Sequence, residues 1–149
     1  MKRLPLILSA SLLGVAFSTS ASALDFKSVG ASPVVMYDAP SEKGRRVYVA
    51  PRGMPVEVVL TYGEWSKVRD AAGTLSWMPS KALTPKRMLV VSAANARIFS
   101  SADENSPVVF TADKNVLLEM LESPNNGWVK VRHRDGQTGF AKAGDVWGD

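Results

Sequence analysis

Two stretches decide the fold of this chain: Trp65-Ser66-Lys67-Val68-Arg69 and Trp128-Val129-Lys130-Val131-Arg132. They lie 63 positions apart. Further pairs keep this spacing and order: Gly73 and Gly136, Trp77 and Phe140, Leu83 and Val146. Upstream the spacing falls to 62, as in Met36-Tyr37 with Ile98-Phe99 and Val47-Tyr48 with Val109-Phe110. Matches that recur in one order indicate an internal repeat.

The change from 62 to 63 requires one extra residue in the second copy. We place it within Pro124-Asn125-Asn126-Gly127, because an insertion is tolerated best in a turn. The repeats then span residues 28–84 and 87–148, joined by a short linker at Thr84-Pro85-Lys86.

Each repeat is predicted to be all-β. The apolar runs are short, and Val56, Val58 and Leu60 alternate with other residues at the period of a half-buried strand. Turn-forming residues separate the runs, and Asp135-Gly136 is a strong hairpin signal because both residues tolerate positive φ. Five short strands in about 60 residues predict a small, strongly bent barrel. A unit of this size is marginally stable alone.

The N-terminus is typical of a secretory signal peptide. Lys2 and Arg3 are followed by an uncharged apolar run from Leu4 to Phe17 and by the small residues Ala21-Ser22-Ala23. We therefore predict that residues 1–23 are a signal peptide cleaved after Ala23, so that the mature chain is exported. A retained N-terminal anchor is the alternative.

Composition excludes several classes of site. The chain has 149 residues, no cysteine and a single histidine, so it has no disulfide framework, thiolate metal site or site of two histidines. The net charge of +4 comes partly from Lys2 and Arg3, without which 16 basic face 14 acidic side chains. Neither repeat is basic enough to predict nucleic-acid binding.

The ordered motifs resemble the bacterial SH3-like (Src homology 3) domain. Repeat 1 carries the resemblance in residues 51–58, in Tyr62-Gly63-Glu64-Trp65 and in Trp77-Met78-Pro79-Ser80; repeat 2 carries it in Gly127-Trp128-Val129-Lys130-Val131 and in Gly139-Phe140. The resemblance implies two tandem five-stranded, partly open barrels packed together after the signal peptide. It also implies a periplasmic protein of the bacterial cell envelope. Related domains on cell-wall enzymes bind peptidoglycan or its stem peptides.

Two departures from the family pattern bear on later arguments. The glycine expected before the second aromatic residue is Gly139 in repeat 2 but Ser76 in repeat 1. Two tyrosines of the eukaryotic proline-binding groove are replaced by Ala39 and Ala82, so we do not expect binding of proline-rich motifs.

No constellation of residues predicts catalysis. His133 lies in a charged turn, and Glu57 and Glu119 fall on separate barrels, too far apart for a pair of glycosidase carboxylates. No nucleophile elbow or metal-binding helix occurs. We therefore predict a protein that is not an enzyme, with no metal and no cofactor.

Aromatic residues are the candidates for ligand binding. Trp65 and Trp128 follow a turn and are expected at the barrel rim, with Tyr37, Tyr62 and Phe99 completing the predicted binding set. We expect four others to fill the cores: Tyr48, Phe110, Trp77 and Phe140. The basic cluster Lys43-Gly44-Arg45-Arg46, with Arg52, is either a solvated loop or a surface for acidic stem peptides or anionic lipid heads.

The favoured function is a non-catalytic module that binds peptidoglycan or its stem peptides. The alternative is a periplasmic protein–protein adaptor or scaffold that uses barrel edges and the seam between the repeats. The short linker predicts that the repeats form one cooperative unit. The run Met88 to Val91 is expected to pair with or cover repeat 1, and Trp147 either covers the seam or completes the core of repeat 2.

Overall fold

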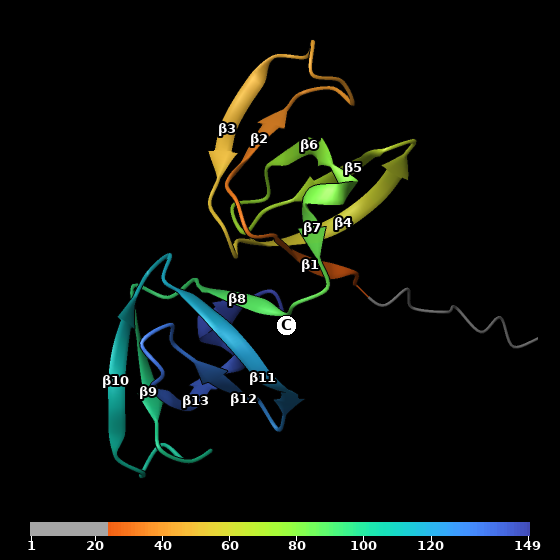
Figure 1. Ribbon diagram of the computed structural model, residues 1–149. Helices are drawn as coiled ribbons and strands as arrows, with labels where there is room; N and C mark the ends of the chain where they lie inside the picture. The colour runs from red at the N-terminus through yellow and green to blue at the C-terminus, as the bar shows by residue number, and fades with distance from the viewer. Residues whose placement is uncertain (1–23) are drawn as a thin grey trace, which may run out of the picture.

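A computed structural model describes residues 24–149, and its strands form two antiparallel sheets of seven strands each. Figure 1 shows them as two separate units joined by the connection from β7 to β8. The predicted signal peptide lies outside the described residues. Within residues 24–149 the helical elements are two three-residue 3-10 turns, and none qualifies as a membrane-spanning helix.

The first unit runs from β1 to β7 in the sheet order β3-β2-β6-β5-β4-β1-β7. Its strands are β1 (Phe26–Val29), β2 (Val34–Tyr37), β3 (Arg46–Ala50), β4 (Pro55–Tyr62), β5 (Trp65–Arg69), β6 (Leu75–Pro79) and β7 (Leu83–Thr84). The 3-10 turn η1 (Ser80–Ala82) separates β6 from β7.

The second unit repeats this order as β10-β9-β13-β12-β11-β8-β14. Its strands are β8 (Met88–Val91), β9 (Asn95–Phe99), β10 (Val108–Asp113), β11 (Leu117–Asn125), β12 (Trp128–Arg132), β13 (Thr138–Lys142) and β14 (Val146–Trp147), with η2 (Ala143–Asp145) before the last strand. The identical strand order in both units confirms the prediction of two tandem all-β units.

Each unit has seven strands where the sequence predicted five. The strands that the apolar pattern missed include β1 and the two-residue strands β7 and β14. In β1, Lys27 and Ser28 interrupt the apolar pattern, although Ser28 is fully buried. Its hydroxyl is satisfied because it donates a 2.7 Å hydrogen bond to the backbone carbonyl of Lys86. A buried polar residue with a partner from another segment cannot be recognised from local periodicity.

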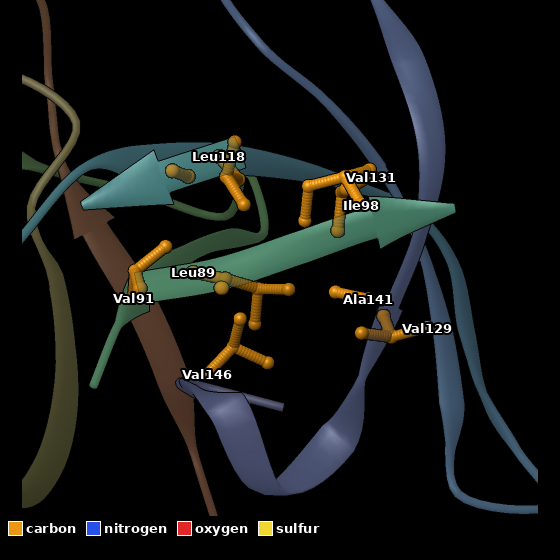
Figure 2. Close-up of a cluster of buried hydrophobic side chains, with 10 residues drawn as sticks. Leu89, Val91, Ile98, Leu118, Val129, Val131, Ala141 and Val146 are labelled. Atoms are coloured by element: carbon orange, nitrogen blue, oxygen red, sulfur yellow. The ribbon is translucent and has the colours of Figure 1, made fainter. Parts of the chain in front are cut away.

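Alternating side chains build one apolar core in each unit. In the first unit the buried cluster consists of Val29, Met36, Ala50, Val56, Val68 and Met78. In the second unit, Figure 2 shows Leu89, Ile98, Leu118 and Val131 converging from four strands. Tyr48 and Phe110 pack against these cores as predicted.

The extra residue of the second repeat lies in a strand and not in the turn. Both hairpins have two-residue turns, because Tyr62 pairs with Trp65 and Asn125 pairs with Trp128. The register of β11 against β12 instead shifts a second time between Glu122 and Asn125. Proline at position 124 has no N–H for the ladder, so this stretch favours a bulge over regular pairing.

Trp147 covers the seam between the units. Its ring meets that of Phe26 edge to face, with centroids 5.1 Å apart and an interplanar angle of 86°. Phe26 is only 8% exposed. Figure 1 places β1 and the C-terminus between the two sheets, where this contact lies.

Arg87, directly before β8, adds contacts at the same seam. Its guanidinium lies 5.6 Å from the centroid of the Phe26 ring, and its Nη2 donates a 2.7 Å hydrogen bond to the carbonyl of Gly148. The run from Met88 to Val91 was expected to pair with or cover repeat 1, and the pairing half of this prediction is wrong. The run is β8, whose two edges are occupied by β11 and β14, but it lies against β4 of repeat 1 without pairing with it. The units are therefore joined by side chains and the linker and not by strand pairing.

Candidate functional site

Trp65 stands on the outer face of the first sheet, turned away from the core. In β5 the residues alternate, with Trp65, Lys67 and Arg69 half-buried and the residues between them buried. Trp65 packs edge to face on Tyr37, with ring centroids 5.6 Å apart and an interplanar angle of 85°. Tyr37 is buried, at 9% exposure, so its ring lies between the Trp65 indole and the interior of the sheet.

The second unit repeats this aromatic pair. The Trp128 ring lies 5.5 Å from that of Phe99, with an interplanar angle of 87°. Phe99 is 2% exposed. The structure therefore brings together four of the five residues predicted to bind ligand as two pairs, in which the tryptophan is the more exposed member.

Tyr62, the fifth predicted residue, is 68% exposed. It lies directly opposite Trp65 across the β4–β5 hairpin. It is not among the residues that line the groove beside Trp65. Its counterpart in the second unit is Asn125.

A groove of about 640 Å³ opens on one side of Trp65, and we call it the first groove. Its walls come from three segments that follow β2, β4 and β6: the β2–β3 loop, the β4–β5 turn and the start of η1. Its lining residues are Pro40, Ser41, Glu42, Lys43, Glu64, Trp65, Pro79, Ser80 and Lys81. A 2.8 Å hydrogen bond from the Ser80 N–H to the Glu64 carbonyl ties the last two segments together.

The second unit has a smaller pocket of about 270 Å³ beside Trp128. Its lining residues are Ala102, Glu122, Ser123, Asn125, Asn126, Trp128, Lys130 and Phe140. Their counterparts in the first unit lie mainly on the outer face of β4 to β6. The first groove and the smaller pocket therefore lie on different sides of Trp65 and its equivalent, Trp128.

Trp77 and Phe140 were predicted to fill the cores, but they lie on the outer faces. Trp77 is half-buried and pairs across the strands with Tyr37 and Lys67. The ammonium of Lys67 lies 5.9 Å from the centroid of the Trp77 ring. Phe140 lines the smaller pocket. Because residues of β6 alternate, burial of Ser76 and Met78 turns Trp77 outward.

The charged residues of the first groove were missed by sequence analysis, apart from Lys43 in the predicted basic cluster. Glu42, Glu64 and Lys81 come from three separate segments, so no local motif gathers them. Arg45 of the basic cluster pairs with Asp38 at 3.4 Å. That pair is exposed, so it contributes little to stability.

The position equivalent to Tyr48 differs chemically between the units. The Tyr48 hydroxyl donates a 3.1 Å hydrogen bond to Asp70 Oδ2. Burial, together with the negative charge of Asp70, raises the pKa of Tyr48 to about 12. In the second unit the Phe110 ring lies 5.9 Å from that of His133, whose Nδ1 is 3.0 Å from Asp135 Oδ1. Both arrangements hold a turn against the barrel.

Among residues 24–149, no group of three or more histidine, cysteine or acidic residues is placed to hold a metal ion. Glu57 and Glu119 each pair with an arginine across the sheet, at 2.9 Å from Arg69 and Arg132 respectively. Both carboxylates therefore take part in ion pairs between neighbouring strands, which is a structural role.

Comparison with known proteins identifies both units. Two family models, each described as a bacterial SH3 domain, match residues 30–85 and residues 92–146. No curated protein matches the sequence.

Three solved structures resemble the chain at low identity. NlpC2 from Trichomonas vaginalis is 14% identical, with 86% of this chain and 49% of that chain covered and a TM-score of 0.40. NlpC1 from Trichomonas vaginalis is 16% identical, with 93% and 50% covered and a TM-score of 0.39. An NlpC/P60 family protein from Bacillus cereus is 19% identical, with 82% and 55% covered and a TM-score of 0.36. The chain spans about half the length of each structure.

Proposed function

The chain belongs to the bacterial SH3 domain proteins, with one domain at residues 30–85 and a second at residues 92–146, and we propose that it is an exported, non-catalytic binding module of the bacterial cell envelope. Its ligand is peptidoglycan or the stem peptides of peptidoglycan. Domains of this family are typical of extracytoplasmic proteins, which agrees with the signal peptide predicted for residues 1–23 and with a periplasmic location.

The first groove is the observation that carries this proposal. It combines an indole, two prolines and four charged side chains in about 640 Å³, within the size range of ligand sites. Trp65 offers a rigid apolar surface at the rim, and tryptophan is enriched among the residues that dominate binding energy.

Binding to purified sacculi tests the proposal directly. The mature chain, residues 24–149, is incubated with sacculi and sedimented, and we expect it in the pellet. Trp65→Ala is expected to weaken binding by about 2 kcal/mol, roughly thirtyfold, as for a central anchor residue. Trp128→Ala is the matched control, because it truncates the equivalent indole of the other unit. A wild-type chain that stays in the supernatant refutes the proposal.

The absence of catalysis is tested at His133. Its contacts with Phe110 and Asp135 are those of a turn residue. We expect His133→Ala to fold and to bind sacculi like the wild type, and neither protein to release soluble fragments from them. Fragment release by the wild type that the variant loses would establish an enzyme.

A protein–protein adaptor is the second candidate, favoured by the outer face of the first unit. Leu60, Tyr62 and Leu75 are 44%, 68% and 45% exposed there. Their counterparts in the second unit are all polar: Glu122, Asn125 and Thr138. Crosslinking in the envelope followed by mass spectrometry separates the candidates. One dominant protein partner, lost in a Leu60→Glu variant, favours the adaptor.

A further inference from the structure

The first groove holds charges of both signs. Glu42 and Lys43 lie on its loop wall, Glu64 lies on the β4–β5 turn, and Lys81 lies on η1. All four side chains belong to exposed residues. None of the ion pairs found within residues 24–149 involves any of the four. Two carboxylates and two ammonium groups therefore face the groove without charged partners.

The second unit lacks this set of charges. The counterparts of Lys43, Glu64 and Lys81 are Asn105, Gly127 and Gly144, none of which is charged. The remaining counterpart is Glu104, which takes the place of Glu42.

Glu104 is held by an ion pair at the position where the first unit has its groove. Its carboxylate pairs with Lys142, and this contact lowers the pKa of Glu104. Lys142 occupies the position of Pro79, because it pairs with Trp128 as Pro79 pairs with Trp65. The two residues also share their backbone conformation, with φ of −68° and −60°. Proline leaves the first groove open, whereas lysine ties the loop to the end of β13 in the second unit.

We infer that ligand binding is confined to the first groove and that its ligand is a zwitterionic peptide, one that carries both a free ammonium group and carboxylates. The inference deepens the proposed function, because it selects the peptide part of peptidoglycan over its glycan strands. The second unit then stabilises the first through the contacts at the seam.

Charge complementarity is the physical basis of this choice. A ligand with one sign of charge would meet two repulsive side chains in the groove, and a neutral glycan would gain no charged hydrogen bond from any of the four. A peptide with both signs can satisfy carboxylates and ammonium groups together, while its aliphatic part lies on Trp65. Charged hydrogen bonds of this kind are stronger than neutral ones.

Soluble muropeptides provide the first probe. Sacculi are digested with a muramidase to soluble muropeptides, and an amidase then separates the free peptides from the disaccharides. Calorimetry on residues 24–149 is expected to show one peptide site per chain and no heat with the disaccharides. Acetylation of the peptide amines is expected to weaken binding about tenfold, the effect of one lost charged hydrogen bond.

Matched substitutions locate the site. Glu42→Gln is expected to weaken peptide binding about tenfold, and Glu104→Gln, its counterpart, to leave binding unchanged. Pro79→Lys places the residue of the second unit in the first, where it can pair with Glu42, and is expected to abolish the peptide site. Pro79→Ala controls for loss of the proline ring and is expected to retain binding.

A second probe separates this inference from the proposed function. The tripeptide Ala-Glu-Lys with free termini is titrated into labelled protein, beside the same peptide with N-acetyl and C-amide caps. We expect shifts of the Trp65 indole resonance with the uncapped peptide and smaller shifts with the capped one. Tripeptide binding without sacculus binding would overturn the proposed function alone. Sacculus binding that is insensitive to charge, or that depends on Trp128, would overturn this inference, and so would failure of the tripeptide to bind in the first groove.

Discussion

Removing the aromatic contact at the seam is expected to uncouple the two units. Phe26 of β1 and Trp147 of β14 meet edge to face at 5.1 Å, and Phe26 is 8% exposed. Phe26→Ala should destabilise the protein by about 3 kcal/mol, the low end of the range for truncating a buried phenylalanine, because one face of the ring meets the Arg87 guanidinium and not a closed core. The pair itself should contribute about 1 kcal/mol beyond its buried area.

Thermal and urea unfolding of residues 24–149 measures both quantities. The wild type is expected to unfold in one transition, because the short linker, the seam and the hydrogen bond from Ser28 to Lys86 tie the units together. A double-mutant cycle of Phe26→Ala and Trp147→Ala isolates the contact, and its coupling energy should be about 1 kcal/mol. Either half alone should be much less stable than the whole, because so small a unit buries little apolar surface.

Tyr62→Ala is the matched control for this cycle. It truncates an aromatic residue of the same unit that is 68% exposed, so stability should change by no more than about 0.5 kcal/mol. Two independent transitions in the wild type that match those of the isolated halves would refute the reasoning. A coupling energy of zero would show that the contact between the two rings contributes nothing to stability.

Three further predictions concern single residues. Because the pKa of Tyr48 is raised from 10.0 to about 12, its stabilising effect is complete below pH 10 and lost as the pH rises toward 12; Tyr48→Phe should remove that alkaline loss in urea unfolding between these pH values. A Cβ at Gly139 would lie 2.6 Å from Ile98 Cγ2 and 2.7 Å from a backbone oxygen, so Gly139→Ala should cost at least about 2 kcal/mol by urea unfolding. The hydrogen bond from Arg132 lowers the pKa of Glu119, so stability from this pair is present above the ordinary pKa and lost as the pH falls; Glu119→Gln should flatten that acid dependence.

The Gly139 position shows which structural details of the repeat the sequence could predict and which it could not. The family pattern has glycine there, and the departure at Ser76 was visible, but its structural reason was not. Gly139 faces a β-branched Ile98, whereas the counterpart of Ile98 in the first unit is the flexible Met36. An unbranched side chain adapts to an added Cβ more readily than a β-branched one. Such compensation between strands distant in sequence requires the fold to be known.

The barrels themselves could be predicted because their determinants are local and occur twice. Alternating apolar residues and glycine turns recur at a nearly constant spacing, so the pattern of each copy supports the strands predicted for the other. The short strands β7 and β14 carry too few residues for any periodicity. The groove could not be assembled from the sequence, because its charged residues come from three loops that only the sheet order brings together.

The comparison between Pro79 and Lys142 shows why duplicated units need not share a function. The core of each unit constrains residues on the inner face, such as Met78 and Ala141, which are both fully buried. The next residue along each strand faces outward, so the fold accepts proline or lysine there with the same backbone conformation. A single outward substitution can therefore close one groove without a cost to the barrel. Because the contact of Trp147 with Phe26 requires both units to be folded, the second unit stabilises the protein even without a charged groove of its own.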